Sequence, residues 1–527
     1  MEGEEPEASM RLAPAAALAA LLAAAGCREA PPRAAAPRPA ARLLPRRLAH
    51  DAKVNALAFS PDGKVLYSGD DGSEGGGSAF YAWDAGTGKR RFRIAAPAGD
   101  RASEPVSALA VSPDGLTLAI ARGPDIEAFP VDGTPKPRWV ESRLHPGGTT
   151  SVAFSPDGRV LASGGWDRRI ALLDPASGRI IARLEGHEAQ VMTVAFSPDG
   201  SVLASAGLDR SVRLWSPADG SEIQKLAGPG GRVFALAFSP DGKSFAAARL
   251  DRTIALHETS TGRPIFPLAG GLERAQTLAF SPDGRFLAAG AIDGSVQVWG
   301  LADARTALAL QGQSGAVTSL AFSPDGRTLA TASLDRTIAL WDLDGRLPAA
   351  NAAEKPSGRE ALEAAWRDLE GESASTAYAA IAQFAAAAPG SLPFLRDRLR
   401  PPIPDPENVR RLVAALDADD FAEREEAMKR LGAMGHAVEI PLRKTLEASP
   451  SPEAADRIRK LLSDLEISLP IPPGPTLAKM RAVQALERIG SPEALGILEE
   501  ISKGPPSAPE TADARSALER LRARQKP

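Results

Sequence analysis

A six-residue pattern that recurs seven times is the feature that most constrains how this chain can fold. The pattern is Ala-Phe-Ser-Pro-Asp-Gly or a close variant, and its last four residues, Ser-Pro-Asp-Gly, are the same in all seven copies. The residues at its aromatic position are Phe59, Val111, Phe154, Phe196, Phe238, Phe280 and Phe322. The first interval is 52 residues and the later intervals are 42 or 43. A period of about 40–45 residues is typical of structural units of four β-strands each.

Each repeat contains short apolar runs that turn residues separate. In the fourth repeat these runs cover 191–196, 202–205 and 212–215. The Ser-Pro-Asp-Gly segment between the first two predicts a tight turn, because proline presets φ near −65° and glycine accepts a positive φ. We therefore predict an all-β propeller of seven blades over residues 42–346, with the strands of each blade joined by hairpins.

The way in which the ring closes can also be predicted. The last repeat ends at 341–343 without a run that could form its fourth strand. The segment 42–48, before the first repeat, stands where the other repeats have their outer strand. We expect this segment to complete the last blade and so to protect the edges of the sheet.

The repeats resemble those of the WD-repeat family over about residues 42–346. The fourth repeat carries the fullest set of family residues, His187, Ser205, Asp209 and Trp215. The resemblance implies that these four side chains form a structural hydrogen-bond relay that holds one blade together. Other repeats depart from the set, with Phe129, Leu173 and His257 at the tryptophan position and Gln313 at the histidine position.

Several polar residues are of the types found in catalytic or metal sites. His187, Ser205 and Asp209 are also the residue types of a hydrolase triad, but no nucleophile elbow accompanies them, so we expect the structural relay. The Gly-rich segment 70–78 lacks the pattern of a P-loop or an EF-hand and is interpreted as a flexible loop within blade one. The five histidines have no close metal-ligand spacing. We therefore predict no enzyme activity, catalytic residue, metal, cofactor or small-molecule substrate.

One corner of the repeat carries a recurrent charge. Four repeats have Asp-Arg between the second and third predicted strands, at Arg168, Arg210, Arg252 and Arg336. The resemblance implies that this corner lies on the face that most often meets partners, and arginine is enriched at interfaces. We expect these arginines to form a partner-binding face for an acidic protein. The alternative is that each arginine pairs with its neighbouring aspartate and is simply solvated.

The pattern changes after residue 346. Residues 347–358 form a polar linker, and from there Leu362, Ala365, Trp366 and Leu369 follow helical spacing. Later segments predict two helix pairs, 421–434 with 438–446 and 477–489 with 493–501. These pairs resemble HEAT-like repeats and a helical tail that follows propellers in planctomycete-type bacterial proteins. We predict an all-α helical-repeat domain over 359–527.

The beginning of the chain predicts export to the cell envelope. Met10-Arg11 precedes an apolar stretch at 12–25 and then Gly26-Cys27, an order typical of a signal peptide. The stretch is shorter than the roughly 20 apolar residues that span a bilayer. Its end resembles the lipobox of bacterial lipoproteins, which implies a signal peptide at 1–27 and lipidation of Cys27. Residues 28–41 are rich in Ala and Pro and predict an extended tether.

Composition narrows the class of partner. The net charge is −4 and the isoelectric point is about 5.9, so the chain lacks the basic footprint of a nucleic-acid-binding protein. Its single cysteine excludes an intramolecular disulfide. We predict a non-catalytic scaffold that binds other proteins and is anchored to the cell envelope by lipid, facing the periplasm or the outer membrane. The alternatives are a propeller enzyme, a hydrolase or quinoprotein with its site in the central channel, and a cytoplasmic regulatory scaffold.

Overall fold

A computed structural model describes eleven stretches of the chain, 45–73, 77–96, 103–227, 231–268, 272–301, 304–347, 358–371, 373–399, 405–448, 450–466 and 474–524. The chain divides into two compact units, a β-propeller and a set of helices. The predicted signal peptide, Cys27 and the tether lie outside the described residues.

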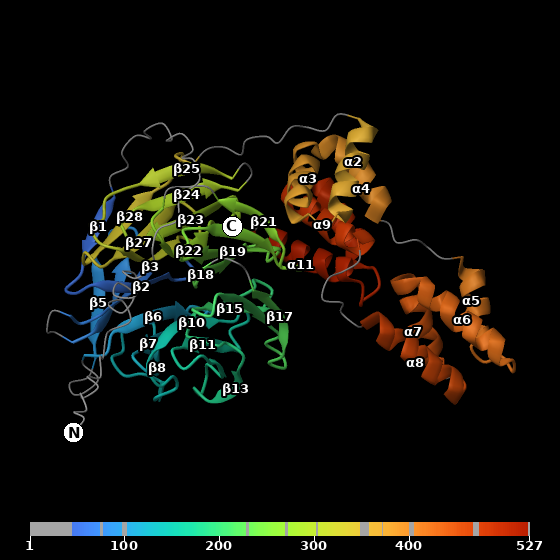
Figure 1. Ribbon diagram of the computed structural model, residues 1–527, viewed down its shortest axis with the longest axis horizontal. Coiled ribbons are helices and arrows are strands. Elements are labelled where there is room, and N and C mark those ends of the chain that lie inside the picture. The colour runs from blue at the N-terminus through green and yellow to red at the C-terminus, as the bar shows by residue number, and fades with distance from the viewer. Residues whose placement is uncertain are drawn as a thin grey trace, which may run out of the picture. The chain divides into compact units, whose positions relative to one another are not determined.

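Seven antiparallel four-stranded sheets form the propeller (Figure 1), as the repeats predicted. Six blades are runs of four consecutive strands: blade one is β2 (Val54–Phe59), β3 (Val65–Asp70), β4 (Ala79–Asp84) and β5 (Arg90–Ala95); blade two is β6 (Val106–Val111), β7 (Thr117–Arg122), β8 (Asp125–Pro130) and β9 (Trp139–Glu141); blade three is β10 (Thr149–Phe154), β11 (Leu161–Gly165), β12 (Ile170–Leu173) and β13 (Ile180–Leu184). Blade four is β14 (Val191–Phe196), β15 (Leu203–Gly207), β16 (Ser211–Trp215) and β17 (Glu222–Ala227); blade five is β18 (Val233–Phe238), β19 (Ser244–Arg249), β20 (Ile254–Glu258) and β21 (Pro264–Leu268); blade six is β22 (Ala275–Phe280), β23 (Phe286–Ala291), β24 (Val296–Gly300) and β25 (Arg305–Leu310).

Blade seven combines the two ends of the propeller sequence. Its strands β26 (Val317–Phe322), β27 (Thr328–Ser333) and β28 (Thr337–Asp342) pair in order, and β1 (Arg46–Ala49) adds as the outer strand, antiparallel to β28. The predicted closure is therefore confirmed, with the strand itself beginning at Arg46. Leu48 from β1 is buried in a cluster with Leu66 of blade one and Ile338 of blade seven.

The first strands of the blades form a closed ring around the centre of the propeller (Figure 1). Each packs against the first strand of the next blade, and β26 packs against β2. The Ser-Pro-Asp-Gly turns form a second ring at one end of these strands. A β-carbon added to the glycine of any turn would lie 3.2–3.6 Å from the Cδ of the proline in the preceding blade's turn, with Gly63 against Pro324 closing the circle. Seven copies of one turn thus close the ring by contact with one another.

Hydrogen bonds within each turn explain why its sequence recurs. In blade four, Ser197 Oγ donates to Asp199 Oδ1 at 2.6 Å, and the same hydroxyl accepts from Val202 N at 2.9 Å. Burial raises the pKa of Asp199, but the hydrogen bonds from Ser197 and Ser201 to its carboxylate lower the pKa below its usual value. Gly200 has a φ of 73°, which a residue with a side chain seldom adopts. Serine, aspartate and glycine are each required by the local geometry of the turn.

The second unit contains ten α-helices and a short 3-10 helix in its described part. They are α2 (Arg359–Glu370), α3 (Ala374–Ala386), α4 (Ala388–Leu399), α5 (Pro406–Ala415), α6 (Phe421–Ala433), η1 (Gly435–Val438), α7 (Glu439–Glu447), α8 (Pro452–Glu466), α9 (Gly474–Ile489), α10 (Pro492–Ser502) and α11 (Pro509–Arg524). The buried face of α2 consists of Leu362, Ala365, Trp366 and Leu369, as its spacing predicted. Asp420 caps α6 and Ser491 caps α10 through side-chain oxygens that accept backbone N–H groups.

The helices form two hydrophobic clusters and not a simple succession of pairs. Helices α2, α3, α4, α9, α10 and α11 share one core, and α5 to α8 share another. The chain therefore leaves the first cluster after α4 and returns to it at α9. Within the inserted group, α6 packs mainly on α5 and α8, and α7 on α8, while Leu431 of the predicted segment 421–434 and Leu442 of 438–446 lie in the same cluster. Helical spacing identifies the buried face of a helix but not the helix that covers it.

Candidate functional site

The corners between the second and third strands of the blades lie on one face of the ring. Neighbouring strands of each blade are antiparallel, so these corners are at the end opposite the Ser-Pro-Asp-Gly turns. Arg168, Arg210, Arg252 and Arg336 occupy equivalent places at the corners of blades three, four, five and seven, and all four are exposed. We call these four residues the corner arginines and the face on which they lie the corner face.

The corner arginines share an unusual backbone conformation. Their φ angles are between 68° and 71°, in the left-handed region. Blade six has Gly294 at the equivalent position, with a φ of 82°. A residue with a side chain in this region costs about 1–3 kcal/mol of strain, and glycine avoids most of that cost. Four arginines therefore stand where the turn itself favours glycine.

The aspartate before each corner arginine is held by its own blade. In blade four, Asp209 Oδ2 accepts from Glu188 N at 3.1 Å and lies 2.8 Å from His187 Nδ1. In blade five, Asp251 accepts from Gly231 N and Thr253 N. Because these carboxylates are turned toward backbone N–H groups and histidine, they fix the corner loop and are not available as the arginines' main partners.

The four family residues of blade four come together in a hydrogen-bond relay. Trp215 Nε1 donates to Ser205 Oγ at 2.8 Å, and Ser205 Oγ lies 2.7 Å from His187 Nε2. His187 Nδ1 in turn contacts Asp209. Burial raises the pKa of Asp209. The hydrogen bond from His187 and the other bonds to the carboxylate lower the pKa by more, so that it lies below its usual range. Ser205 is fully buried, so its hydroxyl is inaccessible to a substrate and serves the blade and not a reaction.

Other blades contain versions of the same relay. In blade one, Trp83 Nε1 donates to Ser68 Oγ, which lies 2.7 Å from His50 Nε2. In blade seven, Thr331 Oγ1 replaces the serine hydroxyl, donating to Gln313 at 2.8 Å and accepting from Trp341 at 3.0 Å. Blade seven therefore keeps the hydrogen-bond pattern of the relay although Gln313 replaces the histidine and Thr331 the serine, because both side chains supply the needed donors and acceptors.

Comparison with known proteins agrees with this geometry. A family model described as "IFT122 first beta-propeller" matches residues 148–367, and one described as "WD domain, G-beta repeat" matches residues 43–73. The propeller is of the WD40-repeat type. ASTRA-associated protein 1 of Verticillium alfalfae is 34% identical over 93 residues, which cover 16% of this chain and 23% of that protein. The chain thus spans less than a quarter of that relative's length.

Blade two of the WD40 propeller holds a buried ion pair in the region where other blades carry the relay. Arg122 Nε donates to Glu127 Oε2 at 3.2 Å, and both side chains are almost fully buried. Arg122 Nη1 also donates to the backbone oxygen of Ser78 at 3.2 Å, and so joins blade two to blade one. Ser78 and Asp70 end the Gly-rich insertion of blade one. Both are buried, so the two ends of this segment lie in the core of the propeller.

The corner arginines differ in their ion pairing. Arg252 Nη2 pairs with Glu273 at 3.2 Å and not with its neighbour Asp251. Arg168 and Arg210 have no ion pair among the residues that the structure describes. The alternative in which each arginine pairs with the adjacent aspartate therefore fails for these three arginines.

Sequence reasoning missed a fifth arginine on the corner face. Arg249 ends the second strand of blade five and is only 6% exposed. Its guanidinium donates from Nη1 to the backbone oxygen of Arg210 at 3.4 Å, and within the described ranges it makes no ion pair. Burial lowers the pKa of Arg249, and the attraction of Asp251 offsets only part of that effect. The signal in the sequence that could have identified Arg249 is its position in the repeat, because blades three and four have glycine there, Gly165 and Gly207.

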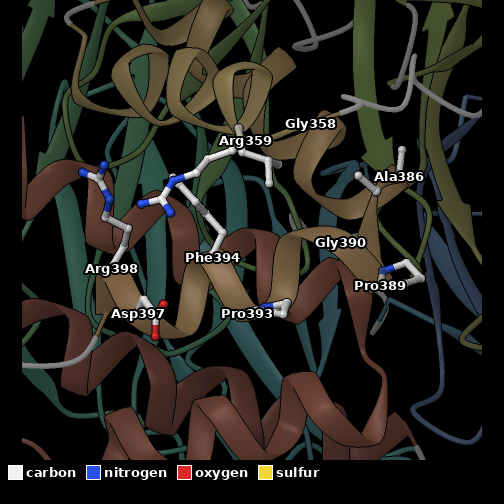
Figure 2. Close-up of a pocket in the computed structure, with 11 residues that line it drawn as sticks. Gly358, Arg359, Ala386, Pro389, Gly390, Pro393, Phe394, Asp397 and Arg398 are labelled. Carbon is white, nitrogen blue, oxygen red and sulfur yellow. The ribbon is translucent and has the colours of Figure 1, made fainter.

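A separate cavity of about 660 Å³ lies among helices α2, α3 and α4 in the second unit. Figure 2 shows Arg398 and Phe394 on one side of it and Pro389 on the other. The guanidinium of Arg398 lies 3.1 Å from Glu363 and over the rings of Trp366 and Phe394. Because this charge already has a partner within the unit, the cavity is a weaker candidate for anion binding than the corner face.

Two further findings concern metal ligands and membrane-spanning helices in the described part of the chain. No three His, Cys, Asp or Glu side chains there are close enough to hold a metal ion. None of the helices described is long and apolar enough to cross a bilayer.

Proposed function

We propose that this protein is a non-catalytic scaffold whose WD40 propeller binds an acidic partner protein through the corner arginines. The observation that carries the proposal is the repetition of an exposed arginine, at the same strained corner, in four blades. Strain that persists where glycine would relieve it favours a role for the side chain itself. Arginine suits this role because its planar guanidinium binds a carboxylate through two parallel hydrogen bonds.

Two further observations support a binding role over a catalytic one. The serine and histidine that could form a triad are buried and engaged in the relay of blade four. The relative from Verticillium alfalfae is named as an associated protein, a name in keeping with work in an assembly. The helical unit is a second surface on which another partner could be held, and its cavity is the feature to test there.

Replacing all four corner arginines by glycine tests the binding face. We expect the variant to lose partner capture from cell envelopes, while its melting temperature stays unchanged or rises. Glycine removes the guanidinium groups and relieves backbone strain, partly offset by the entropy that glycine loses on folding. The measurements are quantitative pull-down with the full chain and thermal unfolding of the same preparations.

Two controls make the result decisive. Capture by the parent protein should weaken with added salt, because exposed charges are screened over about 8 Å at physiological ionic strength. A variant without residues 359–527 tests the helical unit in the same assay. If that truncation loses capture and the four-glycine variant retains it, the helical unit is the binding surface and the proposal for the corner face is wrong.

We also propose that the scaffold is anchored to the cell envelope through a lipid on Cys27. The support is the order of a charged start, an apolar stretch of signal-peptide length and Gly26-Cys27. A Cys27→Ser variant should be released from membranes or accumulate as an uncleaved precursor. Fractionation and mass measurement of the amino terminus check this. If Cys27→Ser fractionates and is processed as the parent is, the chain is not a lipoprotein, and a cytoplasmic scaffold becomes the better proposal.

A further inference from the structure

The inner strands of blades four and five differ from most of the others at one position. Every inner strand has a β-bulge at its second residue, shown by a register shift in all seven pairings with the second strand. A bulge re-aims the side chain of the extra residue. The bulge position therefore faces similar surroundings in each blade, and the residue there can be compared from blade to blade.

In four blades the bulge residue links its strand to the next blade. Ser107 Oγ, Thr150 Oγ1 and Thr318 Oγ1 each donate to a backbone oxygen of the following inner strand at 2.6 Å, and Asn55 Nδ2 does so at 3.2 Å. Blades four and five have Met192 and Phe234 at this position. A thioether and a phenyl ring cannot donate such a bond, so these two side chains place partly exposed apolar surface where the other blades have a polar link.

The side chain of Arg249 lies at the junction between these two blades. Phe234 is the bulge residue next to the pair Val233 and Arg249 at the end of β18 and β19. Met192 is likewise next to the pair Val191 and Gly207, and Gly207 O accepts from the backbone N of Arg210. The side chain of Arg249 reaches Arg210 O from the neighbouring blade. The guanidinium of Arg252 is engaged elsewhere, since its Nη2 pairs at 3.2 Å with Glu273, which precedes the first strand of blade six.

Arg249 is the group that points to a ligand. A guanidinium has five donors, and this one is nine-tenths buried with a single side-chain hydrogen bond within the described chain. Burying a charge without a partner is unfavourable unless a counter-charge is supplied. Burial also lowers its pKa, more than nearby Asp251 raises it. An incoming carboxylate would supply a directly paired counter-charge and the missing acceptors.

We propose that the junction of blades four and five binds a peptide segment that carries an Asp or Glu next to an apolar side chain. The carboxylate pairs with Arg249, and the apolar side chain packs on Met192 and Phe234. This inference rests on the proposed binding role of the corner face and names the place and the chemistry within it. Charge complementarity selects an acidic segment, and the two apolar residues select its neighbour.

The test is a selection of random dodecapeptides displayed on phage against the full chain, followed by anisotropy measurements with fluorescein-labelled copies of the enriched peptides. The junction variant combines Arg249→Ser, Met192→Thr and Phe234→Thr. Each new residue already occupies the equivalent position in another blade, as in Ser333 and Thr150, so the fold should accept them. The matched control is Arg159→Ser, which removes an exposed charge at a Ser-Pro-Asp-Gly turn, on the face opposite the corner face.

We expect the enriched peptides to pair an acidic residue with an apolar one. Their Kd should rise by about tenfold or more in the junction variant, since hydrogen bonds to a charged group contribute about 1.5–3 kcal/mol. The control should change the Kd by less than about twofold, as an exposed charge at a distance contributes little. Arg249→Ser alone should account for most of the loss of acidic peptides.

Other outcomes separate this inference from the broader proposal. If acidic peptides bind but depend on Arg168 and Arg336 and not on the junction, the junction site is wrong and the corner face stands. If the enriched peptides lack acidic residues, or none is enriched, the inference is overturned. The four-glycine capture assay then decides independently whether the corner face binds a folded partner.

Discussion

Replacing Glu127 by alanine should lower the free energy of unfolding by about 3–5 kcal/mol, because it leaves the buried guanidinium of Arg122 without its counter-charge. Arg122 and Glu127 are 2% and 3% exposed, so water cannot take over the lost role. The equivalent position in blades three and seven is Ala171 and Ala339, both buried, so alanine itself fits the fold. The measurement is urea unfolding followed by tryptophan fluorescence.

The matched control is the double variant Arg122→Ala with Glu127→Ala. Removing both charges leaves no unpaired ion, so the double variant should be more stable than Glu127→Ala alone. Blade two would then be held by apolar packing and its strand hydrogen bonds. If the two variants unfold at the same urea concentration, the unpaired charge is not what destabilises Glu127→Ala, and the assignment of this pair as blade two's replacement for the relay is wrong.

Deleting residues 42–48 should lower the melting temperature by about 5–10 °C or cause aggregation. The deletion removes most of β1 and the buried side chain of Leu48, which contributes about 2 kcal/mol through its burial. It also exposes the edge of β28, to which another chain can add as a strand. Differential scanning calorimetry and light scattering measure the two effects.

The control for this truncation is deletion of residues 28–41, the Ala- and Pro-rich segment before the closing strand. We expect that variant to melt as the parent does, because such a composition buries little apolar surface. If deletion of 42–48 leaves the melting temperature unchanged, the ring is held closed by the contacts between inner strands and between the Ser-Pro-Asp-Gly turns, and β1 is dispensable.

Stability and binding make opposite demands on the corner residues. Gly294 in blade six shows that the turn accepts glycine, yet four corners keep arginine at positive φ. If the four-glycine variant is as stable as its parent but no longer binds, the strain is the cost of presenting charge on a rigid face. The rigid setting also limits the entropy lost when a partner binds.

The architecture of the propeller could be predicted from local sequence because its determinants are local. The turn from Ser197 to Gly200 depends on hydrogen bonds and φ angles within a few residues, and it recurs at a nearly constant interval. The seven copies set the number of blades, and the missing outer strand after β28 indicated how the ring closes. The caps of α6 and α10 are equally local, because Asp420 and Ser491 accept backbone N–H groups of the first turns that follow them.

The tertiary structure alone decided which distant residues meet. Arg122 reaches Ser78 across 44 residues, and Arg249 reaches Arg210 across 39, and neither contact follows from spacing. The grouping of α5 to α8 apart from α4 and α9 was likewise beyond the helical pattern. Periodicity determines which face of an element is buried, but the partner is chosen by packing and by the need of each buried charge for a counter-charge. Those requirements are satisfied only once the blades and helices are assembled.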